Sequence, residues 1–357
     1  MGEPVYPTLE LSKRVGQQWP HIEAARALSR ETLEQLRCVF ADSDSDDTSI
    51  VVLGSLGREE FTPTSDIDWF LLVDGIADPN HHSLFLDAKD KIRDFATKGV
   101  GREGTFETFV SSHDLIHRIG GEDDTNKNLT RRLLLLLESA PVGRPIAHER
   151  VVSNILKRYL LEDRSFWRGT TVRRDHIPHF LLNDIARFWR TMAVDFAYKL
   201  RARSGEGWAI RNIKLRMSRK LLYVAGLLAC FRCHLDFPAE ERDSILNDAS
   251  LRLGVVEIVG SIFSDTPLDI IATFALQHKH LDSVSGNLFG AYDEFVGMLL
   301  NENQREHLTK LPEGSGDSDP LYQQAREMSH RFRDSVLNLF FDEEAGLAPL
   351  TRLYGVF

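Results

Sequence analysis

The chain has 357 residues, which is longer than one typical domain, and its 42% hydrophobic and 27% charged residues are ordinary for a globular protein. Its three cysteines make no disulfide framework, and its longest apolar runs are too short to span a bilayer. The first twenty residues mix charge with proline, unlike a signal peptide. We therefore expect a cytoplasmic protein with no membrane partner.

The net charge of −10 argues against a general attraction to nucleic acid. The average conceals a local excess, because residues 151–220 carry sixteen Lys and Arg against six Asp and Glu. A basic block inside an acidic chain indicates a confined anion site rather than a generally basic surface.

The first 145 residues alternate between helix and strand patterns. Apolar residues near helical spacing predict an amphipathic helix at the start, and short β-rich runs bounded by glycine, proline or serine predict strands. In chain order we expect a helix over 22–40, a strand over 49–53, a helix over 56–61, a strand over 66–73, a helix over 84–98 and a strand over 105–110.

Beyond this part, convincing strand patterns stop. Helical patterning is found over 129–138, 155–161, 178–200, 212–230, 268–276, 289–301 and 322–340, with an exposed loop over 311–320. The predicted fold class is α+β: a small α/β domain with a mixed sheet over residues 1–145, and a larger all-α domain over residues 146–357.

Asp66 and Asp68 are the most informative residues. They lie two apart in a predicted strand, so their side chains point to the same face. Ile67, Trp69 and Leu71 then line the other face and can pack on helices. Two carboxylates on one face repel unless a cation lies between them, and hard oxygen ligands suit Mg²⁺ together with substrate phosphates. The alternative is structural, with Asp66 capping the turn and Asp68 as a charge at the strand edge.

The step Gly54-Ser55 supplies the complementary part, eleven residues before Asp66. Glycine at a strand end lets the backbone approach an anion closely, and a serine that opens a helix offers hydroxyl and amide donors. Either piece alone is common. Their combination, in a strand–turn–helix–strand context, points to phosphate chemistry assisted by two metal ions.

The run from Gly54 to Asp68 resembles the nucleotidyltransferase superfamily of the DNA polymerase beta type. It is especially similar to the nucleotidyltransferase domain of bacterial uridylyltransferases that modify PII proteins, although this similarity covers only about twenty-five residues. The resemblance implies a nucleoside triphosphate bound with Mg²⁺ (or Mn²⁺), a nucleotidyl group moved to a hydroxyl, and pyrophosphate released. The catalytic and metal-binding role of Asp66 and Asp68 follows from it.

The resemblance also implies a third carboxylate from a later strand. Glu107, in the predicted strand 105–110, is the best candidate, although the family usually has aspartate there. Asp114 is the rival, and an unidentified residue is a further alternative.

Cationic side chains in the helical part form the second signal. Arg211, Lys214 and Ser218 follow i, i+3, i+7 spacing and would share one helix face, suited to the oxygens of a triphosphate. The resemblance implies a Lys and a Ser on such a helix, and a solvated basic face is the alternative. Arg187 on the preceding helix and Arg58 after the Gly-Ser turn are further nucleotide-binding candidates, each with an ordinary salt bridge as alternative.

We therefore expect a magnesium-dependent nucleotidyltransferase whose acceptor is a nucleotide, a nucleic-acid end, a protein or a small molecule. A nucleotide or oligonucleotide product, as in bacterial antiviral signalling by superfamily members, is the slight preference, with an effector protein as partner. The alternative is a catalytically inactive regulator or partner-binding protein that keeps the fold. A P-loop ATPase is disfavoured because the sequence has no G-x-x-x-x-G-K-[ST] motif.

Overall fold

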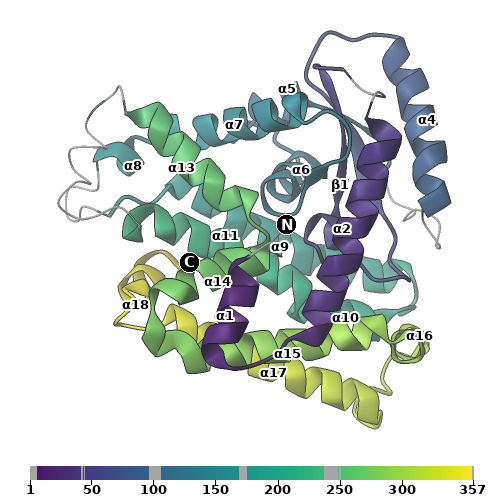
Figure 1. The fold of residues 1–357 in the computed structure, drawn as a ribbon, viewed down its shortest axis with the longest axis vertical. Helices are drawn as coiled ribbons and strands as arrows, with labels where there is room; N and C mark the ends of the chain where they lie inside the picture. Colours follow the sequence, from purple (N-terminus) through teal and green to yellow (C-terminus); the bar gives the residue numbers. More distant parts are fainter. Residues whose placement is uncertain are drawn as a thin grey trace. The chain divides into compact units, whose positions relative to one another are not determined.

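A computed structural model describes residues 6–41, 43, 45–95, 106–168, 175–236, 248 and 251–355. Contacts divide the chain into two compact units (Figure 1). The sheet unit comprises Ala25–Asp184 and Phe237–Thr266, and the helical unit comprises Met1–Ala24, Ile185–Asp236 and Pro267–Phe357. None of the described helices is long and apolar enough to cross a membrane.

The sheet unit contains four strands and the helices around them. Its elements are most of α2 (Pro20–Phe40), β1 (Thr48–Leu53), α3 (Gly54–Gly57), β2 (Asp68–Val73), α4 (Asn80–Phe95), β3 (Phe109–Ser111), α5 (Ser112–Ile116), α6 (Asn126–Leu137), β4 (Ala140–Pro141), α7 (Ile146–Leu161), α8 (Arg164–Arg168), the start of α9 (His179–Ala202), and α13 (Arg252–Ser264).

The strands form a mixed sheet in the order β3-β2-β1-β4. The long central strands β1 and β2 are antiparallel, with Thr48 opposite Val73 and Leu53 opposite Asp68. β3 runs parallel to β2, and β4 is antiparallel to β1. The expected mixed sheet is confirmed.

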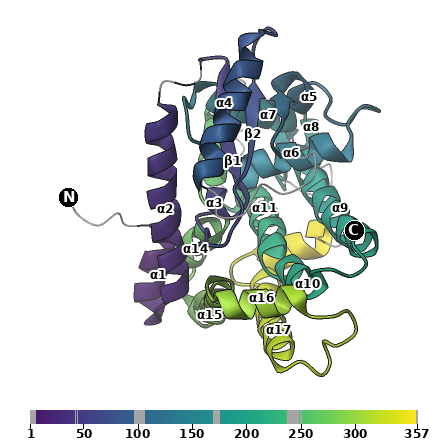
Figure 2. The ribbon, with the colours of Figure 1, turned by 90° about the vertical axis from the view of Figure 1, so that its right-hand side faces the viewer.

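One face of the sheet is covered by α2 and α4 (Figure 2). Ile67, Trp69 and Leu71 of the β2 segment are fully buried in this core, together with the residues of β1 that point the same way. Leu33, Leu36 and Phe40 come from α2, and Ala88 and Ile92 come from α4. Alternation along the strand therefore sends Asp68 to the opposite face, as the sequence predicts.

The helices α6 and α7 lie on the other side of the sheet (Figure 2). Here Arg132 of α6 is completely buried and donates to both carboxylate oxygens of Asp124, at 3.1 and 2.8 Å. The same guanidinium donates to Asp184 at 3.0 Å, and Tyr159 donates its hydroxyl proton to Asp184 at 2.5 Å. Every charge in this cluster has a partner, which is the condition for burying charges without a large penalty.

The helical unit is built from helices only, among the residues that the structure describes. Its elements are α1 (Pro7–Val15), most of α9, α10 (Trp208–Arg216), α11 (Ser218–Leu235), α14 (Pro267–Gln277), a 3₁₀ turn (Lys279–Leu281), α15 (Asp282–Leu300), α16 (Glu302–Lys310), α17 (Pro320–Phe340), α18 (Leu347–Leu350) and a π turn (Thr351–Gly355).

The predicted fold class, a small sheet-containing part followed by a mainly helical part, is confirmed. The two compact units divide the chain differently from the predicted boundary between residues 145 and 146, since the sheet unit includes α7 and α13. The assignment of residues 1–145 and 146–357 to two functional domains stays a prediction.

Candidate active site

The Gly-Ser turn and Asp68 are direct neighbours. Leu53, the last residue of β1, pairs with Asp68, the first residue of β2, so Gly54 begins its turn beside the Asp68 carboxylate. Gly54 has φ +67°, and a Cβ placed on it would lie 2.8 Å from Asp68 Oδ2. Both the left-handed backbone and the close approach require glycine here. The turn therefore places the Asp68 carboxylate directly beside the backbone of Gly54.

Asp66 lies just ahead of β2, because the strand begins at Asp68 and not at residue 66 as predicted. A turn closed by hydrogen bonds between Thr62 and Ser65 occupies the preceding residues, including a side-chain contact of 2.8 Å between their hydroxyl oxygens. Ile67 is nevertheless fully buried in the core beneath α2 and α4. Asp66 is exposed and Asp68 is half-buried, flanking this buried residue.

Ser55 is half-exposed in α3, a single turn that covers Gly54–Gly57. The sequence predicts this serine at the opening of a helix over residues 56–61, with amide donors and a helix dipole. One turn is too short for aligned peptide dipoles to add up, so that part of the expectation is wrong. What Ser55 retains is a hydroxyl beside the turn that contains Gly54.

Arg58 is held by two buried carboxylates. Its Nε donates to Glu60 at 3.0 Å, and its Nη1 forms an ion pair with Glu138. Burial raises the pKa of Glu138, while Arg58 and a hydrogen bond from the Gly54 amide oppose that rise. These contacts favour the salt-bridge alternative for Arg58. They also attach the Gly-Ser turn to Glu60 and Glu138.

Glu138, which contacts the end of the turn at Gly57 and Arg58, was not singled out from the sequence. Its backbone oxygen lies only 1.9 Å from where a Cβ on Gly57 would be, so nothing larger than glycine fits. The signal that could have found this contact is weak, because Glu138 and Arg58 are eighty residues apart.

Glu107 lies two residues before β3, which begins at Phe109 rather than at the predicted residue 105. Its φ of +50° breaks the strand, and its amide donates to the Trp69 carbonyl at 2.6 Å. Its carboxylate forms an ion pair of 2.5 Å with Lys89 of α4, the helix that covers the Trp69 face of the sheet. The structure therefore places Glu107 toward α4, and Asp68 toward the opposite face. Residues 96–105 lie outside the described part.

Asp114, the rival third carboxylate, lies in α5 and forms an ion pair of 3.0 Å with Arg118. α5 follows β3 and is therefore reached from the far end of the sheet, away from the start of β2. The structure does not bring Asp114 beside Asp66 and Asp68.

The cationic candidates Arg187, Arg211, Lys214 and Ser218 belong to the helical unit, which is described by itself. Arg211 and Lys214 are half-buried on α10, and Ser218 is buried at the start of α11. The expectation of one continuous helix is wrong, because Met217 adopts φ −109° and ψ −92° and separates the two helices. The Ser218 hydroxyl donates to the Lys214 carbonyl at 3.3 Å, a contact that often bends helices.

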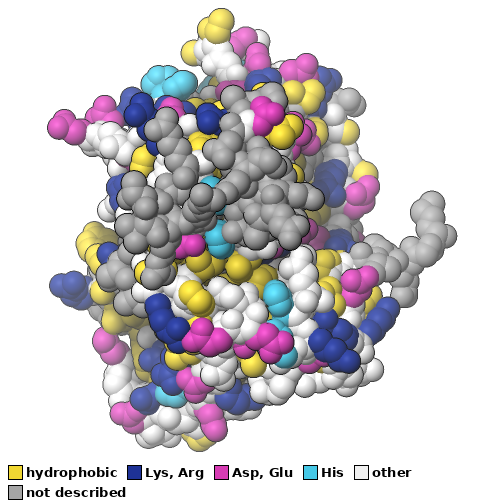
Figure 3. All heavy atoms as spheres, turned by 90° about the vertical axis from the view of Figure 1, so that its left-hand side faces the viewer, with side chains coloured by type: hydrophobic (Ala, Val, Ile, Leu, Met, Phe, Trp, Pro, Cys, Tyr) yellow, Lys and Arg dark blue, Asp and Glu magenta, His cyan; other side chains and the backbone are white. Residues whose placement is uncertain are grey.

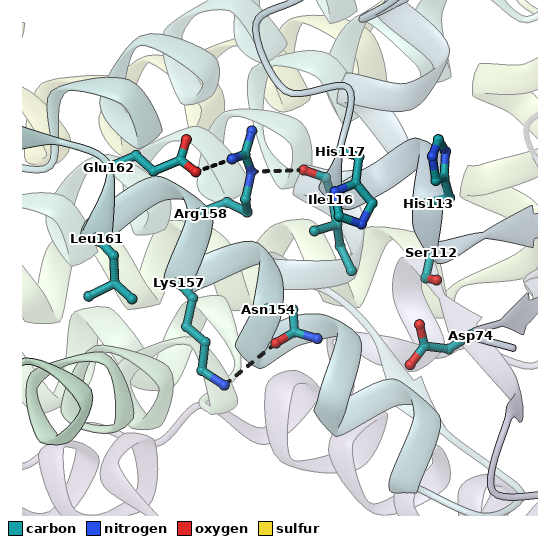
Figure 4. A pocket seen from close by; sticks show the side chains of 10 residues that line it. All are labelled: Asp74, Ser112, His113, Ile116, His117, Asn154, Lys157, Arg158, Leu161 and Glu162. Carbon is teal, nitrogen blue, oxygen red and sulfur yellow. Dashed lines mark hydrogen bonds and ion pairs between the residues drawn. The ribbon is translucent and has the colours of Figure 1, made fainter.

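An open cavity of about 470 Å³ lies at the other end of the sheet unit's parallel strands (Figure 4). Asp74 follows β2 there and Ser112 follows β3. His113 of α5 and His117, the residue after α5, have ring centroids 5.1 Å apart. β2 has six residues, so this cavity and Asp68 are separated by about 20 Å of strand. The cavity is a separate feature from the Gly54–Asp68 site.

The donors present suit a hard divalent cation. Asp66 and Asp68 offer oxygen ligands, and the glycine turn leaves room beside Asp68. No three His, Cys, Asp or Glu side chains gather as a metal cluster within the described ranges. Two carboxylates fit Mg²⁺, which commonly takes one or two protein carboxylates and completes its octahedron with water and substrate phosphates.

Comparison with known families agrees with this geometry. Residues 33–104 match the family model of the nucleotidyltransferase domain, a stretch that contains the Gly-Ser turn and both aspartates. No curated protein matches the chain. The match over residues 33–104 is consistent with the nucleotidyltransferase superfamily.

Proposed function

We propose that the protein transfers a nucleoside monophosphate from a nucleoside triphosphate to a hydroxyl acceptor and releases pyrophosphate. The observation that carries the proposal is the placement of the Asp68 carboxylate against the Gly54 turn, with Asp66 two residues away. A phosphate can approach the turn, and Asp66 and Asp68 would hold a divalent cation beside it.

Asp66 and Asp68 are the proposed ligands of Mg²⁺ or Mn²⁺. When bound, the ion neutralises charge on the phosphates and polarises the reacting phosphorus. The chain's own contribution is to hold Asp68 at the start of β2 with Asp66 two residues ahead of it, while Ile67 and Trp69 anchor the same segment in the core. That rigid support holds the ligands in place with little loss of side-chain entropy on binding.

In the proposed reaction, the acceptor oxygen forms a bond to the α-phosphorus as the bond to the bridging β-phosphate oxygen breaks. Pyrophosphate carries away the electron pair, and the acceptor hydroxyl loses its proton to a nearby base. In this proposal the base is a carboxylate of the site, either Asp66, exposed just ahead of β2, or Glu107 once it leaves Lys89. The Ser55 hydroxyl and the Gly54 backbone orient the triphosphate in this scheme.

Arg211, Lys214, Ser218 and Arg187 are proposed to contact the triphosphate when it is bound. Their positive charges and hydroxyl suit phosphate oxygens. Since Arg58 already binds Glu60 and Glu138, we assign it to support of the turn and leave direct phosphate binding to the other cations.

Glu107 reaches the metal ligands in this proposal only by leaving Lys89. A bound divalent cation offers the carboxylate a stronger partner than an ammonium group that is 45% exposed. This contact is also the observation that favours the second candidate, an inactive nucleotidyltransferase-fold regulator, in which Glu107 stays with Lys89 and the site binds nucleotide without turnover.

A nucleotide or oligonucleotide acceptor is the proposed substrate class, with antiviral signalling as the proposed context and an effector protein as partner. The test is to incubate the protein with each α-labelled ribo- and deoxynucleoside triphosphate and Mg²⁺ or Mn²⁺, and to separate the products by size. A labelled small nucleotide or a ladder supports the proposal. Labelled protein identifies a protein acceptor instead. Nucleotide binding without any labelled product supports the inactive regulator.

A further inference from the structure

Two helices of the helical unit bring basic side chains face to face. α10 packs on α17 through Trp208 and Tyr322, whose ring centroids are 4.7 Å apart, and the Tyr322 hydroxyl donates to Asn212 at 3.1 Å. These contacts fix which sides of the two helices meet. The side of α10 that carries Asn212 faces the side of α17 that carries Tyr322.

The same two sides continue as stripes of positive charge. Arg216 lies one turn beyond Asn212 on α10. Lys220, at the start of α11 beyond the break at Met217, lies close enough to Arg216 for the two charges to interact. On α17, the positions one, two and nearly three turns beyond Tyr322 are Arg326, His330 and Arg333. The stripes touch, since Arg216 Nη1 lies 3.5 Å from His330 Nε2. We name these five cationic or titratable residues the facing basic stripes: Arg216, Lys220, Arg326, His330 and Arg333.

The facing basic stripes are close enough to disturb one another. Burial lowers the pKa of Lys220, and the charges of Arg216 and Arg333 lower it further. Burial and the charges of Arg333, Arg216 and Arg326 lower the pKa of His330, which Asp334 partly opposes. A neutral His330 is then the acceptor for the Arg216 guanidinium.

The acids nearby do not balance this charge. Arg326 pairs with Asp317, which is 94% exposed, and Arg333 pairs with its neighbour Asp334 at the surface. Within the described ranges, neither Arg216 nor Lys220 has a carboxylate within ion-pair distance, and both are half-buried. Half-buried like charges without counter-charges destabilise a fold unless something else neutralises them.

We propose that the facing basic stripes bind a short chain of phosphate groups, through residues other than those proposed for the nucleotidyltransferase site. Guanidinium and ammonium groups are the usual protein donors to phosphate oxygens. Arg326 and Arg333 are seven residues apart, which gives the stripe a length of about 10 Å and suits a few linked phosphates. The proposal does not depend on the proposed transferase activity.

These residues are not the cations expected from the sequence to hold the triphosphate. Arg211 and Lys214 lie three residues apart on another side of α10, since the Asn212–Arg216 side is the one turned toward α17. A nucleic-acid strand is the less favoured occupant, because such surfaces belong to basic domains and this chain carries −10. On the face drawn in Figure 3, the described basic and acidic side chains are interspersed.

The test is calorimetric titration of the full chain with inorganic tripolyphosphate in the presence of EDTA, which removes metal-assisted binding elsewhere. Lys220→Met and Arg216→Gln should each weaken binding by about 10-fold or more, because each removes a charge-assisted contact. Arg331→Gln is the matched control on α17, where Arg331 pairs with Glu294 instead. It should bind as the wild type does.

Thermal unfolding supplies a second readout that does not need the variants to bind. Without ligand, Lys220→Met should unfold at the same temperature as the wild type or higher, because a repulsive charge is gone. Tripolyphosphate should raise the unfolding temperature of the wild type and of Arg331→Gln only. If ATP binds as tightly as tripolyphosphate, the ligand is recognised through its phosphate chain alone. If ATP binds more tightly, the ligand is a nucleoside polyphosphate. No binding, equal binding by all variants, or tighter binding of a short single-stranded oligonucleotide overturns the proposal.

Discussion

Two pairs of aspartates in the sheet unit differ in burial and in the ion pairs that they form. Asp124 and Asp184 are buried and share one guanidinium, that of Arg132, which is itself inaccessible to solvent. Asp66 is exposed, and the described part of the chain shows no ion pair for it, while Asp68 rests half-buried against a glycine. The first two carboxylates are paired with a cation inside the fold, whereas Asp66 is exposed to an ion or substrate from outside.

The comparison predicts the largest loss of stability when the buried cation of the Arg132 cluster is removed. Arg132→Met should lower the free energy of unfolding by about 3–5 kcal/mol, because it leaves two buried carboxylates without their cation. Urea denaturation followed by circular dichroism measures this loss. Tyr159→Phe, which removes one hydrogen bond and keeps both charges paired, should cost only about 1–2 kcal/mol. Equal costs for the two variants would contradict the account of the cluster.

His148 is half-buried with its Nδ1 atom buried, and this environment predicts a dependence of stability on pH. Burial lowers the pKa of His148 to about 4. Its Nε2 lies 2.7 Å from Ser139 Oγ, which donates to the Leu135 carbonyl, so Nε2 carries the proton and Nδ1 is bare. Folding depresses this pKa from its usual 6.5. The folded protein therefore loses no stability through this group above about pH 6.5. As the pH falls toward 4, the free energy of unfolding decreases by about 3 kcal/mol because the unfolded chain binds the proton first.

His148→Leu isolates that effect, because leucine cannot be protonated. The difference in unfolding free energy between wild type and variant, measured by urea denaturation from pH 7 to pH 4, should change by about 3 kcal/mol in favour of the variant. A difference that stays constant over this range would show that His148 can be protonated in the folded protein.

A substitution at Gly54 tests how closely Asp68 is packed against the Gly-Ser turn. Gly54→Ala should cost about 1–3 kcal/mol, from the left-handed backbone and from the contact of the new methyl group with Asp68. Gly120→Ala is the control, since Gly120 has φ +73° and nothing within 4 Å of a new Cβ. Thermal unfolding should show the larger loss at Gly54. Equal losses would mean that Asp68 moves away without cost.

The smallest effect on stability is expected at Asp66. Asp66→Asn should change the unfolding free energy by no more than about 0.5 kcal/mol, because the side chain is exposed and unpaired in the described structure. A loss of several kcal/mol in urea denaturation would make Asp66 a structural cap, as the alternative interpretation of the sequence has it.

The sequence predicts the central part of the sheet well because local patterns decide it. Alternation in β2 places Ile67, Trp69 and Leu71 in the core and Asp68 on the other face, and Gly54 marks the end of β1. The strand ends were displaced by contacts that alternation does not report, such as the Thr62–Ser65 turn and the positive φ of Glu107.

Long-range partners are what sequence patterns could not supply. Arg58 finds Glu138 eighty residues later, and Arg216 meets His330 more than a hundred residues later. Likewise, Asp184 pairs with Arg132 of another helix rather than with Arg187, one turn away on its own helix. Such pairings depend on how helices pack, so they cannot be predicted from the spacing of residues along the chain.

The central claim is that Asp66 and Asp68 serve a reaction. The most direct test is the rate of Mg²⁺-dependent pyrophosphate release from nucleoside triphosphates by the wild type, Asp66→Ala and Asp68→Ala, with thermal unfolding as the check on folding. We expect each variant to remain folded, with an unfolding temperature equal to or above that of the wild type, and to lose activity by about 100-fold or more. Full activity in either folded variant would contradict the claim.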